Sequence, residues 1–143
     1  MQIIGIGGEF GLTLFQRSPG QSVMEPDLHV QCHAKTALFT VPTANAWLEW
    51  PEVRAFVDEL AALNATLKGK AEICAMSPRE LTLTIKSLDS KGHLGFLFEI
   101  GSRNFTDNGQ FESGVAGGFE ILPTDLDALL SWFQLAIANQ TVA

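Results

Sequence analysis

His29, Cys32 and His33 are the residues of this chain whose types come nearest to a metal-binding set. They belong to the segment 27–34, whose alternation of apolar and polar residues predicts a β-strand. In a strand, His29 and His33 share a face but stand about 13 Å apart, while Cys32 points to the other face. A zinc ion needs ligands within about 2.0–2.3 Å, so one ion cannot join the two histidines. We therefore expect surface histidines and no bound metal, and only a further ligand from elsewhere in the chain would complete a site.

Residue sets for nucleophilic or phosphate chemistry are also missing from the sequence. No serine lies in a Gly-x-Ser-x-Gly turn, and the third histidine, His93, follows a predicted hairpin turn. The glycines of GIGGEFG (5–11) do not have the Gly-x-Gly-x-x-Gly spacing of a dinucleotide site. Paired carboxylates such as Asp58-Glu59 lie beside the apolar stripe of a predicted helix, where exposure to solvent explains them. The sequence therefore predicts a non-enzymatic protein without a cofactor.

The remaining candidates are residues for binding another protein. The segment 101–110 (GSRNFTDNGQ) is polar and long enough for a functional loop, although a plain hairpin tip has the same composition. Between residues 99 and 143 there are six carboxylates and one arginine, a set that could steer a basic partner or simply face solvent. A loop aromatic rimmed by charge is typical of an anchor for a protein partner. The expected binding residues are Trp47, Arg103, Phe105, Asp107 and Glu112, with core packing as the alternative for Trp47.

Composition bounds the class of protein further. A chain of 143 residues is expected to form one domain over 1–143. The net charge of −7 argues against a nucleic-acid ligand, because phosphate binding needs a basic face. No apolar run approaches the roughly 18 residues of a membrane helix, and the first residues lack the basic region of a signal peptide. With Cys32 and Cys74 as reduced thiols, we expect a cytoplasmic protein that binds no membrane.

Hydrophobic periodicity predicts the elements that hold these candidates. Strands are expected at 9–16, 27–34 and 36–41, then a turn that contains Trp47 and a helix over Trp47–Gly69. Four more strands are expected at 70–76, 80–88, 93–100 and 115–121, and Thr124 is expected to cap a second helix. Leu60 and Phe98 are expected to join the central helix to the sheet. The order β-β-β-α-β-β-β-β-α predicts an α+β fold, a mostly antiparallel β-sheet with two α-helices packed on one face.

Three stretches together carry a resemblance to a known family. They are AWLEWPEVRAFVDELAALNATLKGKAEI (46–73), ELTLTIKSLDSKGHLGFLFEIG (80–101) and GGFEILPTDLDALL (117–130). The first contains a Leu-x-Gly-x-Ala pattern at the helix end, the second a Gly-His pair after a turn, and the third a Phe-Glu pair before the last helix. In this order, from about Leu28 to Leu130, the chain resembles the WapI-type immunity proteins and their uncharacterised bacterial relatives.

The resemblance implies a small cytosolic, non-enzymatic protein that binds and neutralises a toxin domain. A basic toxin domain would complement the acidic C-terminal third of this chain. The alternative is a small accessory or structural domain, with a homodimer formed through an exposed sheet edge. A neighbouring reading frame that encodes a basic toxin-like domain would favour the first interpretation.

Overall fold

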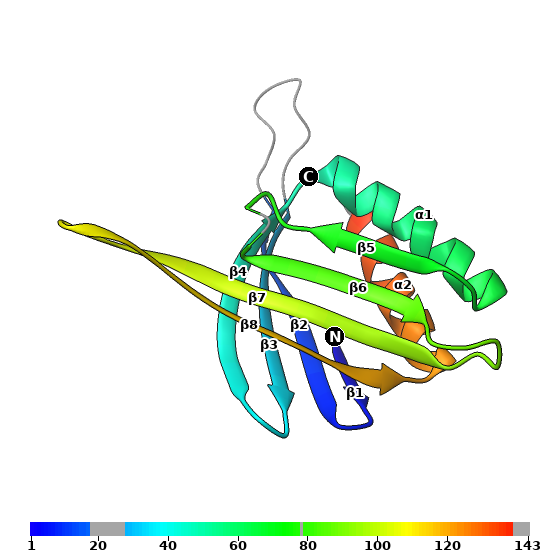
Figure 1. Cartoon of the computed structure of the whole chain (residues 1–143). Helices are drawn as coiled ribbons and strands as arrows, with labels where there is room; N and C mark the ends of the chain where they lie inside the picture. Colours follow the sequence, from blue (N-terminus) through cyan, green and yellow to red (C-terminus); the bar gives the residue numbers. More distant parts are fainter. Residues whose placement is uncertain (18–27, 78, 139–143) are drawn as a thin grey trace.

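The computed structural model describes residues 1–17, 28–77 and 79–138 of the chain. Its elements follow the order β-β-β-β-α-β-β-β-β-α, and neighbouring strands pair antiparallel (Figure 1). The elements are β1 Gln2–Gly5, β2 Gly8–Arg17, β3 Leu28–Thr36, β4 Thr40–Leu48, α1 Trp50–Thr66, β5 Lys70–Cys74, β6 Leu81–Ser87, β7 Leu94–Thr106, β8 Gly109–Ile121 and α2 Pro123–Ala138.

The strands form two four-stranded sheets, β1-β2-β3-β4 and β5-β6-β7-β8, which pack face to face (Figure 1). Phe10 of the first sheet contacts Phe96 and Phe98 of the second, with ring centroids 5.0 and 5.9 Å apart. Phe39 meets Phe98 edge-on at a centroid distance of 6.1 Å. The α+β class is confirmed, but the strands divide into two sheets because α1 stands between β4 and β5 in the chain and packs along β5.

Alternation along the strands determines which side chains enter the core. In β3 each second residue is buried, and the same pattern recurs in β5, in β6 and, from Phe96 to Ile100, in β7. The expected inward set of β7 is confirmed, since Phe98 is only 1% exposed. Among the described residues the buried set contains no polar or charged residue. The core is therefore held by apolar burial, at roughly 25 cal/mol per Å² removed from water.

Both helices bury one apolar stripe against the sheets and each other. In α1 the buried residues include Val53, Phe56 and Leu60, so the expected core position of Leu60 is confirmed. Phe56 meets Phe133 of α2 edge-on at 5.1 Å. Outside the stripe, the carboxylate of Glu59 accepts a hydrogen bond of 2.8 Å from the backbone N–H of Glu72 in β5. Helix α1 thereby covers the edge of the second sheet (Figure 1).

The helix ends differ from those expected. Helix α1 begins at Trp50 and ends at Thr66, and Leu67 rather than a glycine takes the left-handed conformation at the cap, with φ 54°. The Leu67 side chain lies against the turn at Gly92, where its Cδ1 would stand 3.2 Å from an added Cβ. In α2 the N–H of Leu122 donates to the Asp125 carboxylate at 2.9 Å. Leu122 therefore precedes the first turn, and the expected cap, Thr124, lies inside the helix.

Two strands of the first sheet extend the expected set. β1 was not expected because it has only four residues, and it pairs with β2 through a tight turn at Gly7, whose φ is 87°. The expected strand at 36–41 is wrong, since residues 37–39 connect β3 to β4, and so is the expected turn at 42–47, since these residues belong to β4. Pro42 is tolerated there because β4 is an edge strand and its register shifts opposite Cys32 and Ala34.

Neither helix in the described part of the chain combines the length and the apolar sequence that crossing a bilayer requires.

Candidate functional site

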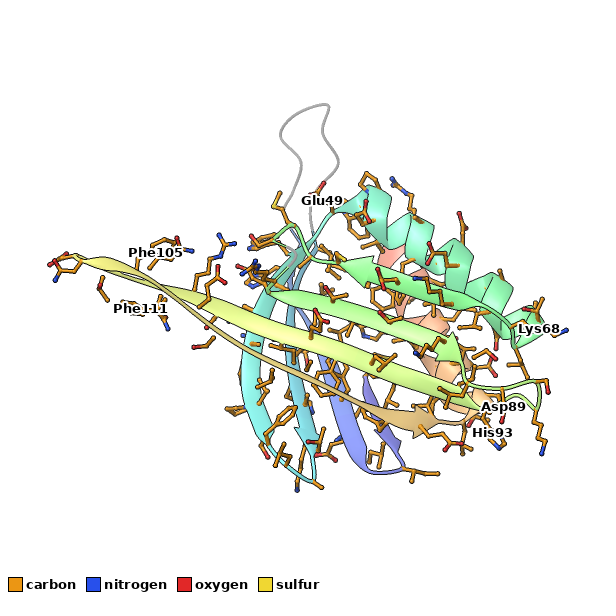
Figure 2. The ribbon with its side chains drawn as sticks, viewed as in Figure 1. Glu49, Lys68, Asp89, His93, Phe105 and Phe111 are labelled. Carbon is orange, nitrogen blue, oxygen red and sulfur yellow. The ribbon has the colours of Figure 1, made fainter. Side chains whose placement is uncertain are left out.

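The most exposed structure of the molecule is the outer part of the β7–β8 hairpin. The two strands pair in continuous register from Leu94↔Ile121 to Thr106↔Gly109, joined by Asp107 and Asn108. β6 accompanies β7 only as far as Leu81↔Ile100. Beyond that pair the hairpin leaves the sheet as a two-stranded ribbon (Figure 2). We call residues 102–113 of this ribbon the arm, and every one of them is exposed.

The arm presents an aromatic ring on each of its faces. Phe105 is 73% exposed and Phe111 is 60% exposed. Phe105 stands opposite Gln110, and Asn104 stands opposite Phe111. Because paired residues share a face and successive residues alternate, the two rings point to opposite sides of the ribbon (Figure 2). Phe111 follows the inner, core-facing side of the sheet, whereas Phe105 follows its outer side.

The base of the arm is tied to the β5–β6 connection. The Glu112 carboxylate forms ion pairs with Arg79 of that connection and with Arg103 across the ribbon, the latter at 3.3 Å from Nε to Oε1. The N–H of Gly101 donates to the carbonyl of Glu80 at 3.2 Å. A Cβ at Gly101 would stand 2.4 Å from the Arg79 carbonyl oxygen, so this close approach requires glycine.

Shallow grooves flank the arm base on both faces. The outer groove, about 400 Å³, is lined by Arg79, Arg103 and Glu112 among others. The inner groove, about 500 Å³, lies between the ribbon and β4, and its apolar lining includes Val41 and Val115. Each is an open depression beside the ribbon.

Four of the five expected binding residues lie together on the arm. Arg103 and Glu112 form its ionic base, Phe105 its outer aromatic, and Asp107 its tip. Of the two expectations for the segment 101–110, the loop is wrong and the hairpin tip agrees with the structure, because all but two of its residues belong to β7 and β8. Neither face of the arm packs on a core, so apolar and polar residues do not alternate along it. The alternation that usually indicates a strand is therefore absent from its sequence.

Trp47 lies elsewhere in the molecule. It belongs to β4 and is half-buried, and its ring stacks on the ring of His29 at 4.5 Å with an interplanar angle of 18°. The expectation that Trp47 lies in a loop is therefore wrong. Its half-buried position and its stack on His29 agree with the alternative that Trp47 packs within its own chain, and Trp47 is not part of the arm.

Phe111 is a candidate that the sequence analysis did not select. A sequence signal for it exists, because Asn-Gly and Asp-Gly pairs are typical of tight hairpin turns and Asn108-Gly109 lies in the middle of the polar segment. A turn at this place continues β7 and β8 as one ribbon, which places Phe111 near Phe105 in space.

The histidine and cysteine candidates of β3 separate as strand geometry predicts. Cys32 points into the core, where burial raises the pKa of its thiol to about 11, so the thiol is protonated at neutral pH. The ring of His33 lies over Gly11 of β2, since an added Cβ there would overlap it. Across the described ranges no group of three or more His, Cys, Asp or Glu side chains could hold a metal ion.

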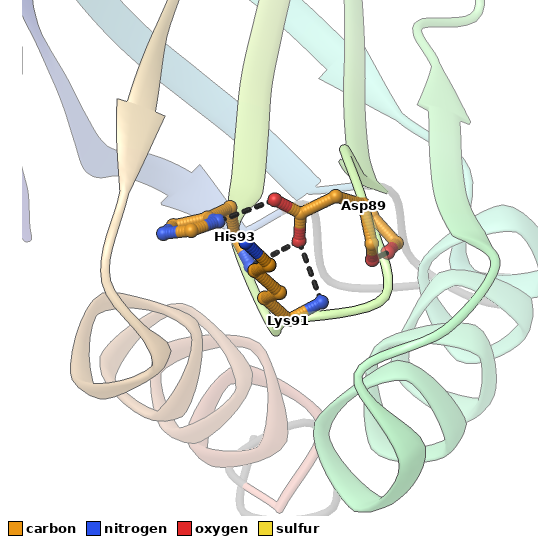
Figure 3. Close-up of polar contacts among 4 residues, drawn as sticks. Asp89, Lys91 and His93 are labelled. Atoms are coloured by element: carbon orange, nitrogen blue, oxygen red, sulfur yellow. Dashed lines mark hydrogen bonds and ion pairs between the residues drawn. The ribbon is translucent and has the colours of Figure 1, made fainter.

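A second polar cluster forms in the β6–β7 turn (Figure 3). The Asp89 carboxylate lies 2.5 Å from Nδ1 of His93 and accepts hydrogen bonds from the backbone N–H groups of Lys91, at 2.8 Å, and His93, at 3.3 Å. The hydrogen bond to His93 is the main reason why the pKa of Asp89 is lowered. The same bond raises the pKa of His93, with smaller help from the charge of Asp89 and then of Glu120.

Asp89→Asn is expected to lower the pKa of His93 toward the ordinary value of about 6.5. The raised pKa of His93 means that its contribution to stability is complete below about 6.5 and is lost as pH rises through the folded-state value. The lowered pKa of Asp89 means that its contribution is complete above about 3.9 and is lost as pH falls through the folded-state value. NMR titration of the His93 ring in the unaltered chain and in Asp89→Asn measures the change in the pKa of His93. Lys91→Ala is the control, because it retains the backbone N–H, and an equal shift in that variant would contradict the assignment.

Comparisons with protein-family models, with curated proteins and with solved structures find no match to this chain.

Proposed function

We propose that this protein binds another protein through the arm, and that its partner is a basic toxin domain which it neutralises. The observation that carries the proposal is a fully exposed ribbon with Phe105 at 73% exposure near its tip. A large aromatic in that place contributes nothing to the core of its own chain. Aromatic side chains are over-represented among the residues that dominate binding energy at protein interfaces.

The shape of the arm favours binding with a small loss of conformational freedom. Its strands are paired up to the turn, and its base is held by Gly101 and by the ion pairs of Glu112. Ordering a flexible loop at an interface costs conformational entropy, which opposes association. A ribbon whose strands are already paired loses much less entropy on binding.

Charge supports a basic partner. The chain carries a net charge of −7, and Asp107 at the arm tip has no ion pair within the described part of the chain, whereas Glu112 is balanced by two arginines. Complementary charge mainly accelerates association, and salt screens it over about 8 Å at physiological ionic strength. The resemblance to WapI-type immunity proteins points to the same class of partner, a toxin domain.

The test is a pull-down from the native strain, followed by binding kinetics with the recovered protein. Phe105→Ala is expected to accelerate dissociation by about 30-fold, the factor that corresponds to a hot-spot loss of about 2 kcal/mol. Asp107→Lys is expected to slow association and to flatten its salt dependence, with dissociation nearly unchanged. Leu135→Ala, at a leucine of α2 that is 61% exposed, is the matched control outside the arm.

Two results would contradict the proposal in different ways. Equal dissociation rates for Phe105→Ala and Leu135→Ala would exclude the arm as the binding element. If the captured protein, expressed alone, does not arrest growth, or if co-expression of this chain does not restore growth, the neutralising role is wrong even where binding holds. A neighbouring reading frame that encodes the captured protein would strengthen the toxin assignment.

A further inference from the structure

The outer edge of β8 carries a row of unpaired backbone groups. The N–H of Ile6 donates to the carbonyl of Glu120 at 3.0 Å, so the backbone groups of Glu120 point away from β7. In an antiparallel pair, alternate residues direct both N–H and C=O to the same side. The register with β7 is unbroken, so the same direction holds for every second residue before Glu120. These residues are Gln110, Glu112, Gly114, Ala116 and Gly118, and β8 pairs with no strand on this side in the described part of the chain.

This edge lacks the devices that usually prevent strand pairing. Natural edge strands are protected by charges, prolines, bulges or shortness. Between Glu112 and Glu120, β8 contains neither a charge nor a proline, and its register with β7 shows no bulge. The open stretch Gln110–Gly118 is nine residues long, which is longer than an average strand.

We propose that a second copy of this chain pairs antiparallel with this edge, about a two-fold axis at Gly114. The two β5–β8 sheets would then form one continuous eight-stranded sheet. The size pattern of the edge is self-complementary in this register. Large residues of one copy stand opposite small residues of the other: Gln110 opposite Gly118, Phe111 opposite Gly117, and Glu112 opposite Ala116.

Charge is also compatible with this register. No two charged residues stand opposite each other, and each Glu112 keeps its two arginines on its own copy. Two chains of net charge −7 repel each other overall, so an edge whose one charged residue, Glu112, is already paired with arginines is a place where they approach more easily.

The first sheet offers each arm a surface to cover. The end of β3 and β4 extends past β8 in Figure 1, and there Leu38 is 90% exposed. This end contacts β8 at Gly117, where an added Cβ would stand 3.1 Å from Phe39 and 3.2 Å from Thr36. In the proposed dimer, Phe111 of the second copy lies opposite Gly117 on the same inner face. An aromatic ring beside a glycine of a neighbouring strand is a favourable sheet contact. Phe111 thereby gains apolar neighbours that the single chain does not provide.

The dimer leaves the outer face of the arm open. Phe105 points to the side opposite Phe111, so self-association through Phe111 and partner binding through Phe105 use separate faces. This inference therefore stands apart from the proposed function, and each can fail without the other.

Sedimentation equilibrium of the full chain at increasing concentration tests the dimer. We expect the apparent mass to rise from 15.5 kDa toward twice that value as the protein concentration rises. Gly114→Lys and Gly114→Glu each place two like charges opposite each other at the axis, which should weaken self-association roughly tenfold or more. Both side chains fit in the single chain without a steric clash, because the nearest atom to a Cβ at Gly114 is the Ile100 carbonyl oxygen at 3.5 Å.

The decisive measurement is an equimolar mixture of the two variants. Lysine then faces glutamate across the axis, and we expect the mixture to dimerise more strongly than either variant alone. Gln134→Lys, at an exposed position of α2 with the same change in charge, is expected to dimerise as the unaltered chain does. A chain that stays monomeric at every concentration overturns the proposal. A dimer that persists in Gly114→Lys, or a mixture that stays monomeric, overturns the edge as its site.

Discussion

Replacing Phe98 with alanine is expected to lower the free energy of unfolding by about 3–5 kcal/mol, the usual range for a buried phenylalanine. Phe98 is 1% exposed and stands between the two sheets, with Phe10 at 5.9 Å and Phe39 at 6.1 Å. Truncation removes its apolar area and leaves a cavity that the two remaining rings cannot easily close. Chemical denaturation with an unchanged m-value measures the loss.

Leu97→Ala is the matched control for Phe98→Ala. Leu97 is the preceding residue of β7, points to the opposite face and is 37% exposed. We expect the free energy of unfolding to fall by much less than in Phe98→Ala, because Leu97 buries less apolar surface when the chain folds. Comparable losses at the two positions would mean that the β7 register is shifted by one residue, which exchanges the faces of the whole strand.

The second large effect is expected at the contact between the two helices. Phe56→Ala in α1 should also cost about 3–5 kcal/mol, because Phe56 is fully buried against Phe133 of α2. Their rings meet at 5.1 Å and 83°, an edge-to-face geometry that contributes about 0.5–1.5 kcal/mol beyond burial. Thermal or denaturant unfolding of Phe56→Ala, Phe133→Ala and the double variant measures this coupling.

The double-mutant cycle separates packing between the helices from general loss of core. A coupling free energy near zero between positions 56 and 133 would contradict the contact, since distant sites add independently. Leu135→Ala on the exposed side of α2 controls for the loss of a large apolar side chain in a helix, and we expect it to change stability by less than about 0.5 kcal/mol.

Local periodicity predicted most of the elements that bury a regular row of side chains, with β4 as an exception, since Ala46 and Leu48 are buried although a turn was expected at 42–47. The alternation of Leu81, Leu83 and Ile85 fixes the buried face of β6 whatever its neighbours are. The three- and four-residue steps of Val53, Phe56 and Leu60 fix the buried stripe of α1 in the same way. Burial acts on each residue through its own position along the strand or helix, so the sequence itself contains this information.

The sequence also located part of the candidate site, through the composition of its residues. The polar segment 101–110 contains Arg103, Phe105 and Asp107, Glu112 belongs to the acidic C-terminal third, and the structure places all four residues on one ribbon. The sequence left a loop and a hairpin tip open for 101–110, because neither face of the arm packs on a core and the alternation that indicates a strand is therefore absent. Trp47 was misplaced because Pro42 indicates a turn locally, whereas the position of β4 at a sheet edge tolerates proline.

The sequence by itself determined which side chains are buried in the main strands and helices, since a period of 2 or 3.6 residues is a local property. Only the tertiary structure decided that the strands divide into two sheets, that β7 and β8 extend beyond β6 as an arm, and that no strand in the described part of the chain pairs with the outer edge of β8. Pairing depends on which edges meet in space and how far each neighbouring strand reaches. No single segment contains that information, because strand alternation specifies a face and leaves the hydrogen-bonding partner unspecified.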